Sequence, residues 1–138
     1  MTLFQDARVK LRIGTVDAAR PGDAARPGDA LLIEGAAMAP AGIAVARFVL
    51  PAWGSHPAGC ACCLPRGPVA EALTRLFLQR VRGEVAFFSE VVSVPASPAG
   101  EAAIRAALQA DPLTLARFRL VRTIDPSHSE GECATAAR

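Results

Sequence analysis

The sequence predicts an α/β protein with a mostly parallel sheet flanked by helices. The second half of the chain alternates between helical and strand periodicity, as in units where a helix connects two parallel strands. The first half supplies two or three apolar strands and little helix. With 138 residues, 51% of them hydrophobic, the chain can bury a substantial core. We expect one α/β domain over residues 1–125, followed by a flexible C-terminal tail over residues 126–138.

Three strands are predicted in the first half. Residues 8–16 alternate apolar and polar side chains, the pattern of a strand with one solvent-facing side. Residues 30–34 form a short apolar run, and residues 43–50 form a second, β-branched run that ends at Pro51. A tandem hexapeptide, Ala-Ala-Arg-Pro-Gly-Asp, occupies residues 18–29, and its two Pro-Gly pairs predict a loop.

The second half is predicted to contain two helices, a short helical turn and two strands. Apolar residues at spacings of three and four predict a helix over residues 68–81, which begins with a proline suited to a first turn. A strand is predicted over residues 85–94 and a second helix over residues 101–110. The helical turn covers residues 112–118, and the last strand covers residues 120–124.

Composition and charge argue against several classes of protein. The net charge is only +2, and no basic run with interleaved aromatic residues occurs, so we expect no nucleic-acid partner. No stretch approaches the ~20 apolar residues of a membrane span, so no membrane partner is expected. The segment from Met1 to Gly14 alternates charged and apolar residues, unlike a secretory signal. We therefore expect a cytoplasmic protein, whose thiols stay reduced.

The densest chemical signal is Gly59-Cys60-Ala61-Cys62-Cys63, which places three of the four cysteines within four positions. Thiolates that converge in this way favour a soft metal ion such as zinc or copper(I). The alternatives are a disulfide or redox pair, and inert burial of cysteines as small hydrophobic residues. A reducing compartment favours the metal over the disulfide.

Three thiolates leave a tetrahedral zinc site one ligand short. His56 lies four residues before Cys60 in the same loop and is the first candidate for the fourth ligand. His128 and Cys133 in the tail, or a water molecule, are the other candidates. An open fourth position would suit transfer of the metal to a partner better than permanent structural binding.

Two polar residues after the cluster also have predicted roles. Arg66 could lower the pKa of the nearby thiols by Coulomb attraction, although an exposed surface arginine is the default interpretation. Asp111, directly before Pro112, is predicted to be a helix N-cap.

Residues 59–125 resemble the G domain of CobW-type GTPases, which are zinc-linked metallochaperones of the P-loop class. The matching features are the Gly-Cys-x-Cys-Cys motif, the helix up to Arg82-Gly83-Glu84, the valine-rich strand, and Ala110-Asp111-Pro112-Leu113 followed by Ala116-Arg117-Phe118-Arg119-Leu120. The resemblance implies a three-layer, Rossmann-like fold related to part of a P-loop NTPase. It also implies that Cys60, Cys62 and Cys63 are the metal ligands.

The nucleotide-binding motifs of that family have no match in the chain. No Gly-x-x-x-x-Gly-Lys-[Ser/Thr] loop occurs, because the sole lysine, Lys10, is followed by Leu11 and follows no glycine loop. The family's Glu-Thr-x-Gly segment aligns with Val94-Pro95-Ala96-Ser97, and an Asn-Lys-x-Asp motif is absent. Without a phosphate cradle and a metal-holding acid, we expect neither nucleotide binding nor GTPase activity.

Three functional hypotheses follow. The leading one is a zinc or other thiophilic-metal binding protein that resembles a CobW-type metallochaperone and has lost nucleotide binding. The alternative is a non-catalytic regulatory module that pairs with an intact P-loop GTPase homologue, or with a second copy of itself, through an exposed sheet edge. The third is an enzyme, either a hydrolase with an unconventional phosphate loop or a thiol redox catalyst built on Cys60 and Cys62.

Overall fold

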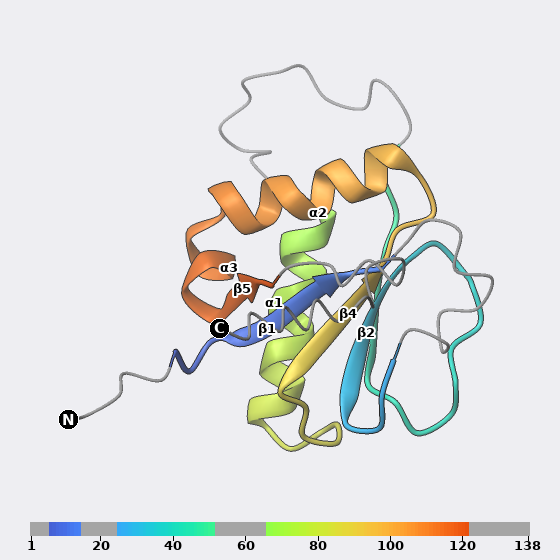
Figure 1. Ribbon diagram of the computed structural model, residues 1–138, viewed down its shortest axis with the longest axis vertical. Coiled ribbons are helices and arrows are strands. Elements are labelled where there is room, and N and C mark those ends of the chain that lie inside the picture. The colour runs from blue at the N-terminus through green and yellow to red at the C-terminus, as the bar shows by residue number, and fades with distance from the viewer. Residues whose placement is uncertain (1–5, 15–24, 52–65, 122–138) are drawn as a thin grey trace, which may run out of the picture.

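The computed structural model describes residues 6–14, 25–51 and 66–121. Within these ranges the strands are β1 (Val9–Ile13), β2 (Asp29–Glu34), β3 (Val45–Phe48), β4 (Glu90–Val94) and β5 (Phe118–Leu120). The helices are α1 (Pro68–Val81), α2 (Pro98–Ala110) and α3 (Pro112–Arg117). Figure 1 shows how the strands form one sheet beside these helices.

The sheet has the strand order β3-β2-β4-β1-β5, and every neighbouring pair is parallel. The predicted α/β class, with a mostly parallel sheet flanked by helices, is therefore confirmed. Because β4 lies between β1 and β2, strands that follow one another in the sequence are not always neighbours in the sheet.

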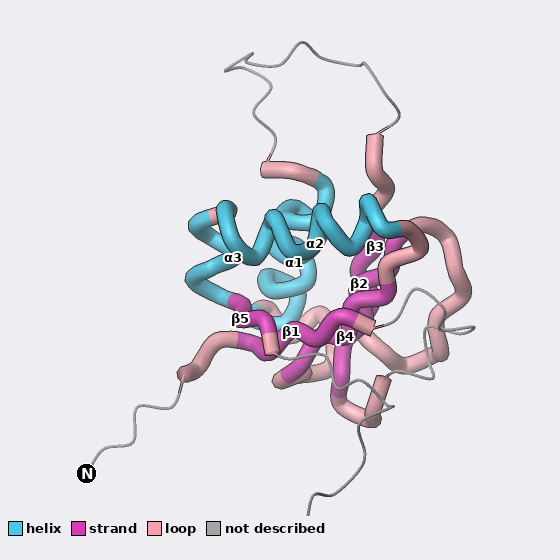
Figure 2. The backbone as a smooth tube through the Cα atoms, turned by 45° about the horizontal axis from the view of Figure 1, so that its top comes forward, coloured by secondary structure: helices cyan, strands magenta, loops and turns pink. Residues whose placement is uncertain are grey.

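The direction in which the chain crosses the sheet explains which face the helices cover. From β1 through β2 to β3 the chain moves toward one edge, and from β3 through β4 to β5 it moves back toward the other. Connections between parallel strands are right-handed in nearly all proteins, so a reversal of direction transfers the connections to the opposite face. All three described helices accordingly lie on one face, as Figure 2 shows. Described residues of the earlier connections, such as Ala25, Ala39 and Ile43, pack on the other face.

The main core lies between the sheet and the helices, because alternate residues of each strand point toward α1 and α2. Its buried members from the strands are Val9, Leu11, Ile13, Ala30, Leu32, Ala46, Phe48, Val91 and Phe118, and from the helices Val69, Ala72, Leu73, Leu76, Ile104 and Leu108. Each large side chain buried here contributes about 1.5–3 kcal/mol to folding. This helix face of the sheet is apolar from β3 to β5 except at Ser93 of β4, whose buried hydroxyl donates a hydrogen bond to the Arg12 carbonyl at 3.0 Å.

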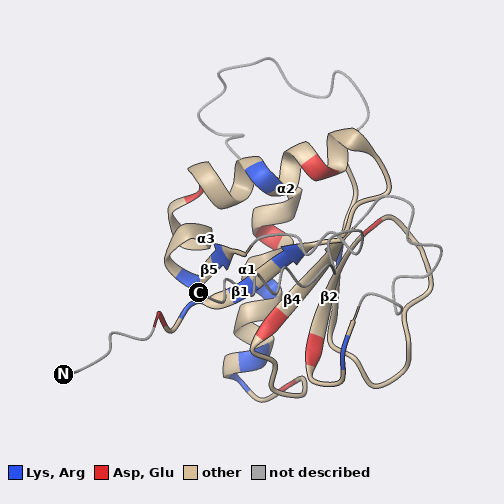
Figure 3. Ribbon diagram, in the orientation of Figure 1, with Lys and Arg blue, Asp and Glu red and all other residues tan. Residues whose placement is uncertain are grey.

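The second face of the sheet is divided into an apolar part and a charged part. The apolar part is formed by side chains of β2 and β4 that are buried against loop residues, namely Leu31, Ile33, Val92 and Val94. With these loops on one face and the helices on the other, the arrangement is consistent with three layers. On β1 the guanidinium group of Arg12 contacts the carboxylates of Glu90 and Asp29, which begin β4 and β2. Figure 3 shows these acidic positions on β2 and β4 beside the basic positions on β1.

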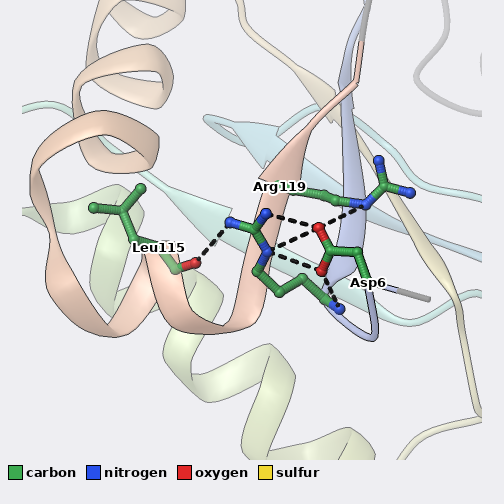
Figure 4. Close-up of polar contacts among 4 residues, drawn as sticks. Asp6, Leu115 and Arg119 are labelled. Carbon is green, nitrogen blue, oxygen red and sulfur yellow. Dashed lines mark hydrogen bonds and ion pairs between the residues drawn. The ribbon is translucent and has the colours of Figure 1, made fainter. Parts of the chain in front are cut away.

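A second polar network ties the residues before β1 to β5 and α3 (Figure 4). Arg8 donates two hydrogen bonds from Nε and one from Nη2 to the Asp6 carboxylate, and Arg119 Nε lies 3.6 Å from Asp6 Oδ2. Arg8 Nη1 also donates to the Leu115 carbonyl at 3.3 Å. The hydrogen bonds from Arg8 are the main reason that the pKa of Asp6 is lowered to about 2.

Two element boundaries in the second half differ from the sequence-based prediction. Helix α2 begins at Pro98 and not at residue 101, because the Ser97 hydroxyl caps it by accepting a hydrogen bond from the Gly100 amide at 3.0 Å. The last strand begins at Phe118 and not at residue 120, because Phe118 is already extended, and residues 122–124 of its predicted range lie outside the described residues. Its buried ring packs edge-on against Phe77, with 6.0 Å between ring centroids.

The helix predicted over residues 68–81 has the bounds of α1, whereas other predicted strands are longer than the observed ones or extend outside the described residues. The strand predicted over residues 85–94 is confined to β4, and the strand predicted over residues 43–50 is confined to β3. β1 lies within the strand predicted over residues 8–16, of which residues 15 and 16 lie outside the described residues. The tandem hexapeptide ends inside β2, whose first residue is Asp29, after a turn at Gly28 with φ +89°. Residues 18–24 of the repeat and the predicted tail over residues 126–138 lie outside the described part of the chain.

Candidate functional site

The predicted metal ligands lie in a connection whose two ends are described. Cys60, Cys62, Cys63 and His56 fall in residues 52–65, outside the described part, as do His128 and Cys133. The preceding residue, Pro51, follows β3, and the following residue, Arg66, precedes α1. A connection from a parallel strand to the next helix starts at the carboxyl edge of the sheet, which is where α/β proteins bind ligands.

Arg66 is held firmly at the end of this connection. Its Nε donates to Asp111 Oδ1 at 2.9 Å and its Nη2 donates to Asp111 Oδ2 at 2.5 Å, which is a bidentate ion pair. Its Nη1 donates to Thr74 Oγ1 on α1 at 2.7 Å. One guanidinium group therefore links the residue after the cysteine segment to α1 and to the junction between α2 and α3.

The ion pair changes the interpretation of Arg66. The side chain is only 30% exposed, so the default interpretation as an exposed surface arginine is wrong. The hydrogen bonds to Asp111 raise the pKa of Arg66 and hold the pKa of Asp111 well below its usual range. Because the Asp111 carboxylate already neutralises the guanidinium group of Arg66, this arginine is poorly suited to stabilise the thiolates of the cysteine motif.

Asp111 lies at the junction of α2 and α3 and interacts with both helices. It follows the last residue of α2, and its side chain accepts hydrogen bonds from the Thr114 amide and the Thr114 hydroxyl, both at 2.8 Å. The predicted N-cap at Asp111 is therefore confirmed. The buried Thr114 hydroxyl and the Arg66 guanidinium share the two carboxylate oxygens, so the cap and the ion pair are one structure.

A second carboxylate, that of Glu34, occupies the N-terminus of α2. Glu34 ends β2, and its Oε2 accepts hydrogen bonds from the Ala96 amide at 2.6 Å and the Ser97 amide at 3.0 Å. Its Oε1 accepts from the Ser97 hydroxyl at 2.8 Å. These amides belong to the N-cap residue Ser97 and to the residue before it, next to the positive end of the helix dipole, where an anion is favoured. In this protein the anion is one of the chain's own side chains.

The first turn of α2 leaves space for the Glu34 carboxylate because residue 100 is a glycine. A Cβ atom added to Gly100 would lie 1.9 Å from Glu34 Oε2 and 2.4 Å from Cδ, so only glycine leaves room for the carboxylate. Gly100 is also the residue whose amide donates to the Ser97 cap. The helix start, its cap and the glutamate therefore form one closely packed unit.

This unit lies at the topological switch point of the sheet. β2 and β4 are neighbours, yet the connection after β2 leads to β3 on the second face, whereas the connection after β4 leads through α2 on the helix face. Ligands of open α/β sheets bind in the crevice that such a divergence creates. Here Glu34 crosses from β2 to the start of α2 at that crevice.

The residues aligned with the Glu-Thr-x-Gly segment of the CobW-type family lie in the same place. Val94 is a buried residue at the end of β4 and belongs to the apolar cluster on the second face. It supplies no carboxylate, and the amides of Ala96 and Ser97 are already bonded to Glu34. Sequence analysis did not identify Glu34. The available signals were its position at the carboxyl end of a strand and the Ser-Pro pair that starts α2.

An apolar cavity of about 580 Å³ lies between the first turn of α1 and the second half of α2. Small side chains dominate its lining, namely Ala70, Ala103, Ala106, Ala107 and Ala110. Arg66 and Asp111 also belong to the lining. The cavity is therefore adjacent to the described end of the connection that contains the cysteine motif.

Comparison of the chain with protein-family models, with curated proteins and with solved structures found no match. In residues 6–14, 25–51 and 66–121, no three His, Cys, Asp or Glu side chains are grouped so that they would hold a metal ion. Among the helices of the same ranges, none has the length and apolar character that a membrane crossing requires.

Proposed function

We propose that this protein binds zinc or another thiophilic metal ion through Cys60, Cys62 and Cys63. The observation that carries the proposal is the presence of three thiols within four positions, in a connection whose described ends follow β3 and precede α1. Thiolates are the preferred ligands of zinc and copper(I), and a cytoplasmic location, which is part of the proposal, would keep them reduced. His56 is the first candidate for a fourth ligand.

We propose further that the protein resembles a CobW-type metallochaperone without nucleotide binding. The absence of a phosphate-binding loop in the sequence supports this, and so does the position of Glu34. A phosphate group placed at the start of α2 would have to displace a carboxylate that accepts three hydrogen bonds. It would also meet the negative charge of that carboxylate at close range.

Metal content measured together with thiol reactivity tests the metal site. Protein purified under reducing conditions, without a metal-affinity tag, should contain about one zinc ion per chain by elemental mass analysis, because the three thiols form a single site. Replacing Cys60, Cys62 and Cys63 together by serine should remove the metal. Cys133→Ser removes the one thiol outside the cluster and tests whether that residue is needed as the fourth ligand.

The outcomes separate the competing hypotheses. Loss of metal in the triple variant and retention in Cys133→Ser supports the proposed ligand set, and weaker binding in His56→Ala supports the fourth ligand. Protein that holds no metal, takes up none on titration with zinc or copper(I), and keeps all four thiols reactive would contradict the proposal. A reversible disulfide between Cys60 and Cys62, with no metal bound, would favour the redox hypothesis.

Nucleotide binding is tested separately with labelled GTP and ATP in the presence of Mg²⁺. We expect no binding at millimolar nucleotide, because neither a glycine-rich loop nor a free helix N-terminus at the switch point is present in the described residues. Saturable binding of GTP by the unmodified chain would contradict this part of the proposal without affecting the metal site.

A further inference from the structure

The outer edge of β3 is open among the described residues. In the described part of the chain, β3 is the terminal strand of the sheet and pairs with β2 alone. Amides of β2 and of the residue after it donate to the carbonyls of Ala44 and Phe48 at 2.8 and 2.9 Å, so alternate residues of β3 are bonded to β2. The backbone N–H and C=O groups of Val45 and Arg47 therefore point away from the sheet. Unpaired groups of this kind can accept another strand.

The charged side chain that could protect this edge is directed elsewhere. Proteins often place a lysine or arginine on an edge strand to prevent pairing with other chains. Arg47 Nη1 donates to the carbonyls of Gly35 at 3.1 Å and Ala37 at 2.7 Å, which fixes its guanidinium group against the loop after β2. Val49, which directly follows β3, is 69% exposed. Val45, Arg47 and Val49 alternate onto this side of the strand, and because the Arg47 guanidinium group is held by the loop after β2, the two valines border the edge.

On the helix side, the edge borders a polar cavity of about 310 Å³. It is lined by Val45, Ala46 and Arg47 of β3 and by Arg75 and Gln79 of α1. Arg75 is exposed, and no ion pair or hydrogen bond of its side chain occurs among the described residues. The same holds for the side-chain amide of Gln79, one turn further along the helix. Beside the edge, α1 thus presents a positive charge and an amide group that find no partner in residues 6–14, 25–51 and 66–121.

We propose that the edge of β3 binds an extended acidic segment of another protein as an added strand. Side chains of a strand alternate between its two sides, so one set of the partner's residues would face Arg75 and Gln79 and the other would lie beside Val45 and Val49. Carboxylates fit the first side and apolar side chains fit the second. The main-chain hydrogen bonds to Val45 and Arg47 supply affinity, and the charge of Arg75 selects the acidic partner.

This interaction surface is independent of the metal proposal, since none of its residues belongs to the cysteine motif. Binding is measured on the full chain by fluorescence anisotropy. The probe is a labelled hexapeptide of alternating glutamate and valine, and the comparison peptide has lysine in place of glutamate. The acidic peptide should bind more tightly, by about tenfold or more, since like charges across an interface are disfavoured.

Two variants separate the charge from the backbone pairing. Arg75→Gln should weaken binding of the acidic peptide by about three- to tenfold, as expected for one partly exposed charge. Val45→Pro removes an outward N–H group at a position where an edge strand tolerates proline, and it should reduce binding below detection. Arg105→Gln on α2 is the matched control for loss of an arginine, and it should leave binding unchanged.

The result can overturn the proposal in two ways. Equal affinity for the two peptides, or an affinity that neither variant changes, would exclude an acidic strand at β3. Concentration-dependent dimerisation in analytical ultracentrifugation that Val45→Pro abolishes, and that the acidic peptide does not compete with, would assign the edge to a second copy of the chain. Arg75→Gln keeps the proposal testable even where Val45→Pro impairs folding, because Arg75 is an exposed helical residue.

Discussion

The two faces of the sheet are built from the same strands but are covered differently. The helix face packs against α1 and α2 in one continuous apolar cluster, whereas the second face has a smaller apolar cluster under loop residues and a charged part on β1. Right-handed connections account for the division, because within the described residues only the return from β3 toward β5 passes through helices. The comparison shows that the order of the strands in the sheet decides which face is packed against helices.

The first prediction compares neighbouring valines that point to opposite faces. Val91 and Val92 of β4 are both buried, Val91 in the helix-face cluster and Val92 in the second-face cluster. Val91→Ala should lower the free energy of unfolding by about 2–3 kcal/mol and Val92→Ala by about 1 kcal/mol, since loops can relax into a void more readily than packed helices. Urea denaturation of both variants gives the difference. Equal losses would show that the second face is packed as rigidly as the first.

The second prediction concerns Glu34, which joins the two sets of connections. Glu34→Ala should cost about 2 kcal/mol, because three hydrogen bonds to a carboxylate are lost at the start of α2. Gly100→Ala should also destabilise the wild-type protein, because its Cβ would clash with the Glu34 carboxylate.

A double-mutant cycle tests this coupling. Without the carboxylate, the same Gly100→Ala change should be neutral or stabilising by up to about 1 kcal/mol, as alanine is the better helix former. Thermal unfolding of the four proteins measures the coupling. Additive losses would mean that Gly100 is required for a reason other than the approach of Glu34.

The third and smallest effect lies within the helix layer, at the ion pair between Asp111 and Arg66. Asp111→Asn should lower the free energy of unfolding by about 1–2 kcal/mol at neutral pH. The pKa of Asp111 is lower in the folded protein than its ordinary value of 3.8, so its contribution is fully present above that value and is lost as the pH falls below it.

The pH dependence provides the check. The stability difference between wild type and Asp111→Asn should be constant between about pH 5 and 7 and should shrink below about pH 4, the usual pKa of an aspartate. Denaturant titrations across this range measure it. A difference that persists unchanged at pH 2 would indicate that the ionised carboxylate is not the stabilising form.

Local signals in the sequence predicted the helices and strands well. The predicted boundaries were wrong where a local signal was missing or where contacts with distant residues set the boundary. The helix over residues 68–81 and the N-cap at Asp111 depend on neighbours within a turn or two, and both are confirmed. The start of α2 was missed because alanine and glycine at residues 99 and 100 gave no amphipathic pattern. The shift of the last strand to Phe118 depends on packing against Phe77, which is 41 positions earlier in the sequence.

The candidate site was predicted only in part. The cysteine motif is a purely sequential feature, and its ligand set stays a prediction because residues 52–65 lie outside the described part of the chain. Glu34 and Ser97 are 63 positions apart, and Arg66 and Asp111 are 45 apart, so no local pattern relates them. Both pairs form only when the strands assemble.

The sequence by itself therefore determined the α/β class, the order of helices and strands, and the cluster of thiols, because periodicity, caps and ligand spacing are local properties. Only the tertiary structure decided the strand order and the separate coverage of the two faces. It also decided the occupation of the α2 N-terminus by Glu34 and the neutralisation of Arg66 by Asp111. These features depend on contacts between distant segments, and the handedness of the connections and the burial of apolar side chains select them when the sheet is formed.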